Sequence, residues 1–380
     1  MTDLAQITKR TTKRSELTAE ERYYLASQFQ LMWQKFRRHK LAIIGGILLI
    51  LLYFMALFAD FLAPYTPEQR IHKYSYHPPS KIHFVDSEGK WQEPFIYRTS
   101  ITRDPDTLML IYQEDPNVHF PIRLFVAAEP HKVLGFINTN IHLFGVDQRD
   151  GIYLFGTDNI GRDILSRIMY AARLSLTIGL VGVAISFLIG VTLGGISGYF
   201  GGAVDTLIQR VIEFLISIPT IPFWIALAAS LPKNWTVVQN YFAIIVILSL
   251  MSWGGLARVV RGKFLELREL DYVLAARVSG VSEGSIIRTH LLPNFVSYLI
   301  VNITLAIPEM ILGETALSFL GLGLRPPAVS WGVLLQDAQN IRSVALYWWN
   351  IIPALFVIIT VVAFNFVGDG LRDAADPYKQ

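Results

Sequence analysis

Residues 258–294 have the sequence RVVRGKFLELRELDYVLAARVSGVSEGSIIRTHLLPN and lie between two long apolar runs. Six basic side chains in this stretch, here called the basic segment, outnumber its four acidic ones. The basic residues are Arg258, Arg261, Lys263, Arg268, Arg277 and Arg288. Because short loops rich in Lys and Arg stay in the cytoplasm, this charge bias places the basic segment on the cytoplasmic face of a membrane.

The basic segment has the pattern of a helix, a second short helix and a turn. Apolar residues recur at spacings of three and four from Val260 to Leu270, which predicts the first helix. The second contains Ala275 and Ala276, Gly280 suits its C-terminal stop, and Pro293 is expected to close the unit. Two alanines give a low surface that a partner can approach closely, so we expect a docking helix. The alternative is an ordinary loop in which the alanines only favour helix.

Composition bounds the class of protein. The chain has 380 residues, of which 52% are hydrophobic, and a mean hydropathy of +0.41, too apolar for an ordinary soluble domain. The net charge of +3 is small, so we infer no nucleic-acid partner. Cysteine is absent, which excludes disulfides and thiolate chemistry, and the sequence has no phosphate-binding loop for ATP.

The N-terminal 40 residues precede the first apolar run. Residues 1–17 are polar, and residues 18–21 have the capping-box pattern that opens a helix with one apolar face. Basic residues at 35–40 follow directly, which indicates a helix lying on the cytoplasmic leaflet; packing on a soluble partner is the alternative. The first membrane span then covers residues 41–62, with the N-terminus inside.

Residues 63–170 are polar and punctuated by proline, and we expect them to form an extracytoplasmic, β-rich insert. Residues 86–89, Asp-Ser-Glu-Gly, predict a hairpin turn between two of its strands. His83 and His119 have no metal-like spacing, so no metal site is expected there. The strands are expected at KIHFVD (81–86), FIYRTS (95–100), LMLIYQ (108–113), IRLFVAA (122–128) and HLFGV (142–146).

The fold class expected is an all-α polytopic membrane protein of six spans, with an interfacial helix and the β-rich insert. Residues 171–370 form a five-helix core, and residues 371–380 a cytoplasmic tail that returns the C-terminus to the inside. Glycines in the second span favour close helix packing, and Pro219 and Pro222 interrupt the third. The five later spans are expected at 174–198, 207–231, 241–256, 295–320 and 351–367.

Polar side chains within the spans are candidates for a translocation path, because they usually face a bundle interior or a watery route. Glu213, Ser217 and Thr220 are spaced as one helical stripe, and Arg210 can pair with Glu213. Structural pairing between spans is the alternative.

A second candidate stripe lies in the fifth span. Asn302 and Glu309 are seven residues apart and share a face, whereas Glu314 should point elsewhere. Pro308 is expected to loosen the helix beside Glu309 as a gate hinge.

The order Ala275-Ala276, Gly280, Leu292-Pro293 resembles the coupling loop of membrane subunits of bacterial ABC importers, placed here at residues 257–294. Leu274 stands where that family usually has an acidic residue. Asp271-Tyr272 and residues 290–294, HLLPN, look like the oligopeptide/dipeptide/nickel branch.

A second block supports the same resemblance. Residues 155–176, FGTDNIGRDILSRIMYAARLSL, match the segment that precedes the second span in the oligopeptide-permease branch, with alanine at 171 and 172 where glycine is frequent. GETALSFLGLG (313–323) and LRDAADP (371–377) also resemble that family. Within the block we expect one ion-pair network of Asp158, Arg162, Asp163 and Arg167 that fixes the insert above the span.

The resemblance implies one of two permease subunits of an importer in the bacterial inner membrane, with both termini cytoplasmic. It implies a second permease, two cytoplasmic ATPases that hold ATP and Mg²⁺, and an extracytoplasmic substrate-binding protein. This chain itself is then no enzyme, binds no cofactor, contacts lipid, and couples to the ATPases through Asp271, Ala275, Ala276, Gly280 and Pro293.

The implied cargo is an oligopeptide, with nickel or an opine- or sugar-like solute as alternatives. Three other functions stay open: an ion-driven secondary transporter using Glu213 and Glu309, a membrane enzyme with its chemistry in the insert, and an exporter subunit.

Overall fold

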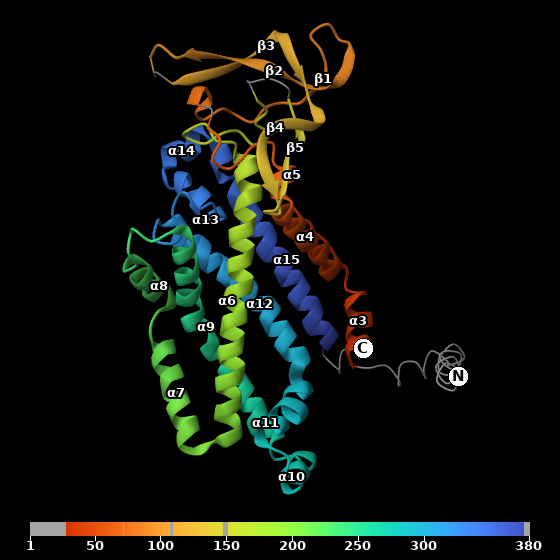
Figure 1. Ribbon diagram of the computed structural model, residues 1–380, viewed down its shortest axis with the longest axis vertical. Coiled ribbons are helices and arrows are strands. Elements are labelled where there is room, and N and C mark those ends of the chain that lie inside the picture. The colour runs from red at the N-terminus through yellow and green to blue at the C-terminus, as the bar shows by residue number, and fades with distance from the viewer. Residues whose placement is uncertain (1–27, 71, 107–108, 147–150, 376–380) are drawn as a thin grey trace, which may run out of the picture.

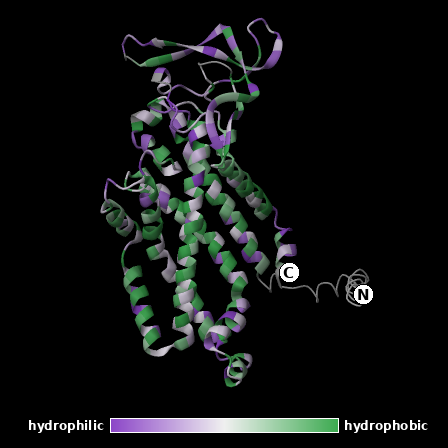
Figure 2. Ribbon diagram, viewed as in Figure 1, coloured by the Kyte–Doolittle hydropathy of each residue, from purple (hydrophilic) through white to green (hydrophobic). Residues whose placement is uncertain are grey.

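The computed structural model describes residues 28–70, 72–106, 109–146 and 151–375. The expectations for residues 1–17, for the capping box at 18–21 and for the end of the tail lie outside these ranges. The molecule is an elongated helical bundle with the β-rich insert at one end and the short helix α10 at the other (Figure 1). Hydrophobic residues cover the bundle helices, and hydrophilic residues gather in the insert (Figure 2).

Within the described ranges, five helical segments are long and apolar enough to cross a membrane, and a bent helix pair supplies a sixth candidate span. The first is α4 (Lys40–Leu57), which follows the short helix α3 (Gln28–Phe36). His39 caps α4 by accepting a hydrogen bond from the backbone N–H of Ala42 at its Nδ1. A one-turn helix, α5 (Ala59–Leu62), then leads into the insert.

The second span, α6 (Ile164–Phe200), is the longest single helix in the described part of the chain. Its 37 residues extend about 55 Å, well beyond the ~30 Å of a bilayer core. Four of its glycines, from Gly190 to Gly198, lie against α9 (Val237–Leu267), where a Cβ at Gly198 would come within 2.6 Å of the carbonyl oxygen of Arg261. The expected close packing of this glycine-rich helix is therefore confirmed.

The third span is two helices rather than one. α7 (Gly202–Ser217) and α8 (Thr220–Ala229) meet at 85°, and Pro219 stands at the N-cap of α8. Pro219 has no N–H to continue the helical ladder, so the expected interruption is a full break. The expected stripe of Glu213, Ser217 and Thr220 is consequently wrong, because Thr220 belongs to the other helix.

Two expected boundaries around the basic segment are also wrong. α9 is continuous, so the expected fourth span and the first helix of the basic segment are one element. Pro293 does not close the unit, because it occupies the first turn of a 3₁₀ segment (Leu292–Phe295), where its missing N–H costs no hydrogen bond. α10 (Asp271–Val278) is followed by a non-helical turn at residues 279–282. From there the chain is helical through α11 (Glu283–Ser285), a π-helical turn (Ile286–Leu291) and this 3₁₀ segment into α12 (Val296–Phe319).

The C-terminal span is longer than expected. Short helical turns, among them α13 (Trp331–Leu334) and α14 (Ile341–Leu346), connect α12 to α15 (Ile352–Ala375). The helix therefore continues through the start of the expected tail at Leu371. α15 packs against α4, where a Cβ at Gly45 would come within 2.6 Å of the carbonyl oxygen of Ala363.

The insert is β-rich, as expected, and consists of two small antiparallel sheets. β1 (His83–Val85), β2 (Trp91–Arg103) and β3 (Leu110–Pro121) form one, and β4 (Arg123–Val133) and β5 (Ile137–Gly145) form the other. The expected turn at residues 86–89 joins β1 to β2, with Gly89 at a φ of +81°.

Candidate functional site: a docking helix and a central cavity

The helix α10 has a buried side and an exposed apolar side. Val273 is fully buried against Phe264 of α9 and against Ile286 and Leu291 of the π-helical turn. On the other side Leu274 and Ala275 are exposed, and Val278 is 89% exposed. Ala276 is half-buried and packs on the same cluster as Val273. An apolar face that is held rigidly and left in solvent is the form expected of a docking surface.

Gly280 and Asp271 define the two ends of α10. Gly280 has a φ of +77° and donates its N–H to the carbonyl of Arg277, so it ends the helix as the sequence predicts. Asp271 lies in the first turn, where its negative charge favours the helix dipole. The adjoining Tyr272 hydroxyl accepts a hydrogen bond of 2.9 Å from Asn294 Nδ2, which connects α10 to the start of α12.

Arginine side chains tie the basic segment to the turn between α6 and α7. Arg268 donates from one guanidinium nitrogen to the carbonyls of Gly198 and Tyr199, at 3.1 and 3.2 Å. Arg277 of α10 lies over the ring of Tyr199, 5.4 Å from its centroid. Arg261 pairs with Asp205 of α7. These contacts join α10 and α9 to the adjoining ends of α6 and α7.

A half-open cavity of about 350 Å³, here called the central cavity, lies between α6, α8, α9 and α12. Asn302 and Glu309 of α12 line it together, as their seven-residue spacing predicts. Ser186, Thr220 and Ser252 add hydroxyl groups from the other three helices. The cavity combines these polar groups with a larger apolar wall, including Trp224, Met251 and Met310. Such a lining suits transient contact with a polar solute.

The remaining candidate path residues lie elsewhere. Glu213 is exposed on α7 and pairs with Arg210 at 2.8 Å. The hydroxyl of Ser217 donates to the carbonyl of Phe214 within its own helix, at 2.7 Å. Neither lines the cavity. The break at Pro219 separates both from Thr220.

Glu314 marks a polar cluster whose members the sequence did not connect. As expected, it points away from the face of Asn302 and Glu309, because it is fully buried outside the cavity. The hydroxyls of Ser318 and Ser330 each donate to its Oε1 at 2.7 Å. The Ser330 side chain also caps α13, so the carboxyl group joins α12 to the connection before α15. The only sequence feature that pointed to this cluster is the four-residue spacing of Glu314 and Ser318, which places both on one face of a helix.

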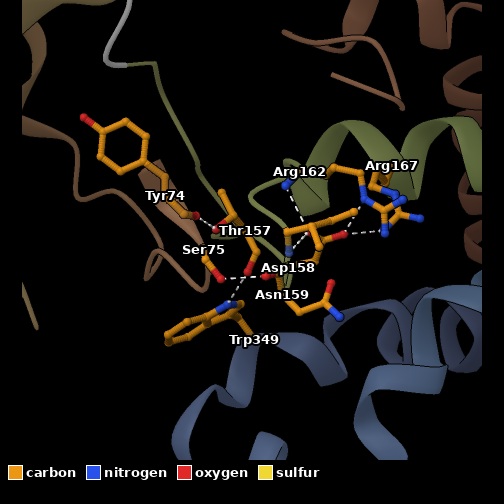
Figure 3. Close-up of polar contacts among 9 residues, drawn as sticks. Tyr74, Ser75, Thr157, Asp158, Asn159, Arg162, Arg167 and Trp349 are labelled. Atoms are coloured by element: carbon orange, nitrogen blue, oxygen red, sulfur yellow. Dashed lines mark hydrogen bonds and ion pairs between the residues drawn. The ribbon is translucent and has the colours of Figure 1, made fainter. Parts of the chain in front are cut away.

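The insert is fixed to the bundle by the block at residues 155–167 (Figure 3). Asp158 accepts from Arg162 Nε and from an Arg167 terminal nitrogen, each at 2.6 Å. The Thr157 hydroxyl donates to the carbonyl of Tyr74, and Trp349 Nε1 donates to the carbonyl of Thr157 at 3.0 Å. These contacts join the start of the insert, the start of α6 and the segment before α15.

Asp163 does not join the ion pairs of Asp158, contrary to the single network expected. It caps α6, where its Oδ2 accepts from the N–H and the hydroxyl of Ser166 at 2.7 and 2.6 Å. Burial raises the pKa of Asp163 to about 7, and its Oδ1 has no hydrogen-bond partner among the described residues. The Asp163 side chain lies there because it caps the helix, and the spacing of the charged residues in the sequence does not reveal where the helix begins.

Comparison with known families identifies the chain. Residues 190–379 match the family model of the binding-protein-dependent transport system inner membrane component. Residues 27–79 match the N-terminal TM domain of oligopeptide transport permease C. The first match covers half of the chain and contains the basic segment and the residues of α7 to α15.

Curated relatives agree with the family models. The dipeptide transport system permease protein DppC of Bacillus subtilis is 42% identical over 59% of this chain and 68% of its own length. The oligopeptide transport system permease proteins OppC of Haemophilus influenzae and Escherichia coli are 44% and 42% identical, over 60% and 61% of this chain and 71% and 74% of theirs. An inward-facing structure of the MetNI methionine ABC transporter aligns at 18% identity with a TM-score of 0.42, over 56% of this chain and 97% of that chain. The resemblance seen in the sequence is confirmed: the chain belongs to the binding-protein-dependent transport system inner membrane components, the multi-pass membrane permeases of ABC transporters.

Proposed function

We propose that this chain is one of the two permease subunits of an ATP-driven importer that moves oligopeptides across the inner membrane into the cytoplasm. The proposal of peptide cargo rests on the relatives, which are dipeptide and oligopeptide permeases. The polar and apolar lining of the central cavity is compatible with a peptide, whose backbone carries donors and acceptors along its whole length.

The observation that carries the proposal is the exposed apolar face of α10, formed by Leu274, Ala275 and Val278. It lies at the end of the bundle opposite the insert (Figure 1). Its surroundings are basic, which favours the cytoplasmic side. A cytoplasmic ATPase subunit docks there, and the substrate-binding protein delivers cargo at the insert end. Both termini of the chain are then cytoplasmic.

The structure suggests how force reaches the cavity. Val273 anchors α10 in the apolar cluster with α9, and the arginines of the basic segment fix it to the ends of α6 and α7. Closure of two ATPase subunits around MgATP moves α10, and the attached helices change the access of the cavity. For this mechanism, the docking face must bind the ATP-bound ATPase dimer more tightly than the open one. A partner shifts an equilibrium between two states only by the difference in its affinity for them.

A second permease completes the complex. α7 and α8 expose large apolar side chains, including Leu207, Phe214 and Ile221. These surfaces border the cavity-lining helices, so a second permease on this side closes the translocation path. In this arrangement, Glu213 and Ser217 face the second permease rather than the cavity of this chain.

The test is uptake of a labelled oligopeptide into proteoliposomes holding the full chain, a second permease, the ATPase pair and the binding protein. The account predicts uptake that needs ATP and every partner. Val278→Asp should lower it at least tenfold, whereas Val278→Thr, which keeps the β-branched shape without charge, should transport normally. Uptake driven by a proton gradient without ATPase would contradict the mechanism. ATP-dependent uptake of nickel or a sugar, with none of peptide, would contradict the cargo alone.

A further inference from the structure

The turn between β4 and β5 is composed of apolar residues. Residues 133–137 are Val-Leu-Gly-Phe-Ile, and Gly135 has a φ of +82°. Leu134, Phe136 and Ile137 are 36%, 72% and 49% exposed. Turns that face water use Gly, Asn, Asp, Pro and Ser, and consecutive exposed apolar residues indicate a contact surface. The turn between β1 and β2, Asp-Ser-Glu-Gly, has the ordinary polar composition.

This apolar turn is held at the end of the first span. The N–H of Leu134 donates to Asp60 Oδ2 at 3.2 Å, and Asp60 comes three residues after Leu57, the last residue of α4. Near the other end of the hairpin, His142 Nδ1 lies 2.5 Å from the carbonyl oxygen of Ala63. Figure 1 shows β4 and β5 descending from the insert to the top of α4. The hairpin therefore has a fixed height relative to the span.

That height is the edge of the apolar part of the bundle. Asp60 accepts from two guanidinium nitrogens of Arg173, at 2.9 and 2.7 Å, and Arg173 also donates to the carbonyls of Ala56 and Leu57. A charged pair with a partly exposed arginine belongs at the polar boundary, because its cost in hydrocarbon is high. Directly below it, the exposed face of α4 is lined by Ile47, Ile50, Leu51, Phe54 and Leu57.

We propose that the turn of residues 133–137 inserts into the lipid interface beside α4, as a second membrane contact of the extramembranous insert. It is held through Asp60 of α5, directly beyond the exposed apolar face of α4. It is also narrow: Lys132 and Asn138, which flank it, are exposed and polar. A short apolar segment with an aromatic residue and a flanking basic residue has the composition of an interfacial anchor. This anchor sets the height of the insert above the bilayer, whatever the cargo.

The chain has no cysteine, so single cysteines report on this turn directly. Phe136→Cys in the full chain carries an environment-sensitive fluorophore, in phosphatidylcholine nanodiscs with or without lipid spin-labelled near the top of the acyl chain. The matched control is Ser87→Cys, exposed in the polar turn between β1 and β2. Both substitutions are at exposed positions, so neither removes core packing.

The expected result at residue 136 is blue-shifted emission that loses roughly half its intensity to spin-labelled lipid and is protected from aqueous iodide, since interfacial residues sit ~5–10 Å into the headgroup boundary. The probe at 87 should show the reverse. Quenching of residue 136 by iodide and not by lipid would overturn the proposal. Protection from both quenchers, appearing only when the second permease or the binding protein is added, would also overturn it, by assigning the turn to a protein partner.

Discussion

Arg261 of α9 holds Asp205 of α7 in a two-pronged ion pair, with Nε 2.5 Å from Oδ1 and Nη2 2.5 Å from Oδ2. Asp205 also accepts from the hydroxyl of Ser197 near the end of α6. One carboxylate thus joins three helices at the end of the bundle that carries α10. In the proposed mechanism, this pair connects the basic segment, to which Arg261 belongs, with α6 and α7.

Breaking this pair should loosen the connection without unfolding the protein. A double-mutant cycle of Asp205→Asn and Arg261→Gln should give a coupling energy of about 1 kcal/mol, the upper range for partly exposed pairs. Each single variant should lower peptide uptake more than ATP hydrolysis. The matched control is the exposed Lys263–Glu266 pair, 2.8 Å apart within α9, where both effects should be near zero. Equal couplings for the two pairs would contradict the role given to Asp205.

Removing the carboxylate of Asp158 should destabilise the protein more than removing the guanidinium of Arg162. Asp158→Asn removes the ion-pair partner of Arg167, whose side chain is 5% exposed, and should cost about 3–5 kcal/mol of stability. Arg162→Gln should cost much less, because Arg162 is 17% exposed and Asp158 keeps Arg167. Thermal unfolding of the two variants in detergent makes the comparison. Equal destabilisation would show that Arg167 does not depend on Asp158.

Asp163 predicts a pH dependence with a definite sign. Burial raises its pKa to about 7, so the protonated acid stabilises the fold, fully at pH values below its ordinary range and less as pH rises through 7. Asp163→Asn imitates the protonated acid and still caps α6. Its advantage in stability over the native protein should therefore grow as the pH is raised from 5 to 8. The pH dependence of the native protein's stability does not isolate Asp163, because His77 contributes to it as well. Burial lowers the pKa of His77 to about 4, so the stability that this group contributes is lost as the pH falls below 6.5. A difference in melting temperature that does not change from pH 5 to pH 8 would contradict the assignment.

Filling the central cavity should block transport selectively. Ala306 lines the cavity from α12, and tryptophan there would occupy much of its volume of about 350 Å³. Ala306→Trp should abolish uptake while the complex still assembles and hydrolyses ATP. Ala316→Trp, on the exposed side of the same helix, is the control and should transport. Normal uptake by Ala306→Trp would place the path outside this cavity.

The hydrophobic pattern of the sequence predicted the helical class, the approximate positions of the spans and the β-rich insert. It also brought Asn302 and Glu309 to one face, because seven residues complete nearly two turns of any unbroken helix. The pattern did not predict where a helix breaks and where it continues. Pro219 breaks a helix and Pro293 does not, although both are prolines in apolar surroundings.

Contacts between residues far apart in the chain could not be predicted from the sequence. Asp163 resembles its charged neighbours in spacing, and only the start of α6 makes it a cap. Asp60 gave no signal for Arg173, which is 113 residues away in the chain. The pairing depends on how two helices cross, which periodicity does not determine. Likewise, nothing in the sequence indicated that the apolar turn at residues 133–137 lies beside the end of the first span, which its hydrogen bond to Asp60 shows.

In the proposed importer, an ATPase subunit docks on the exposed apolar face of α10. In the assembled complex, single cysteines at Val278 and Ala275 carry a short photoactivatable crosslinker, and Ser87→Cys in the insert is the control. The account predicts an adduct with the ATPase subunit from positions 275 and 278 and none from position 87. Complexes that still transport peptide but give no ATPase adduct from either α10 position would contradict it.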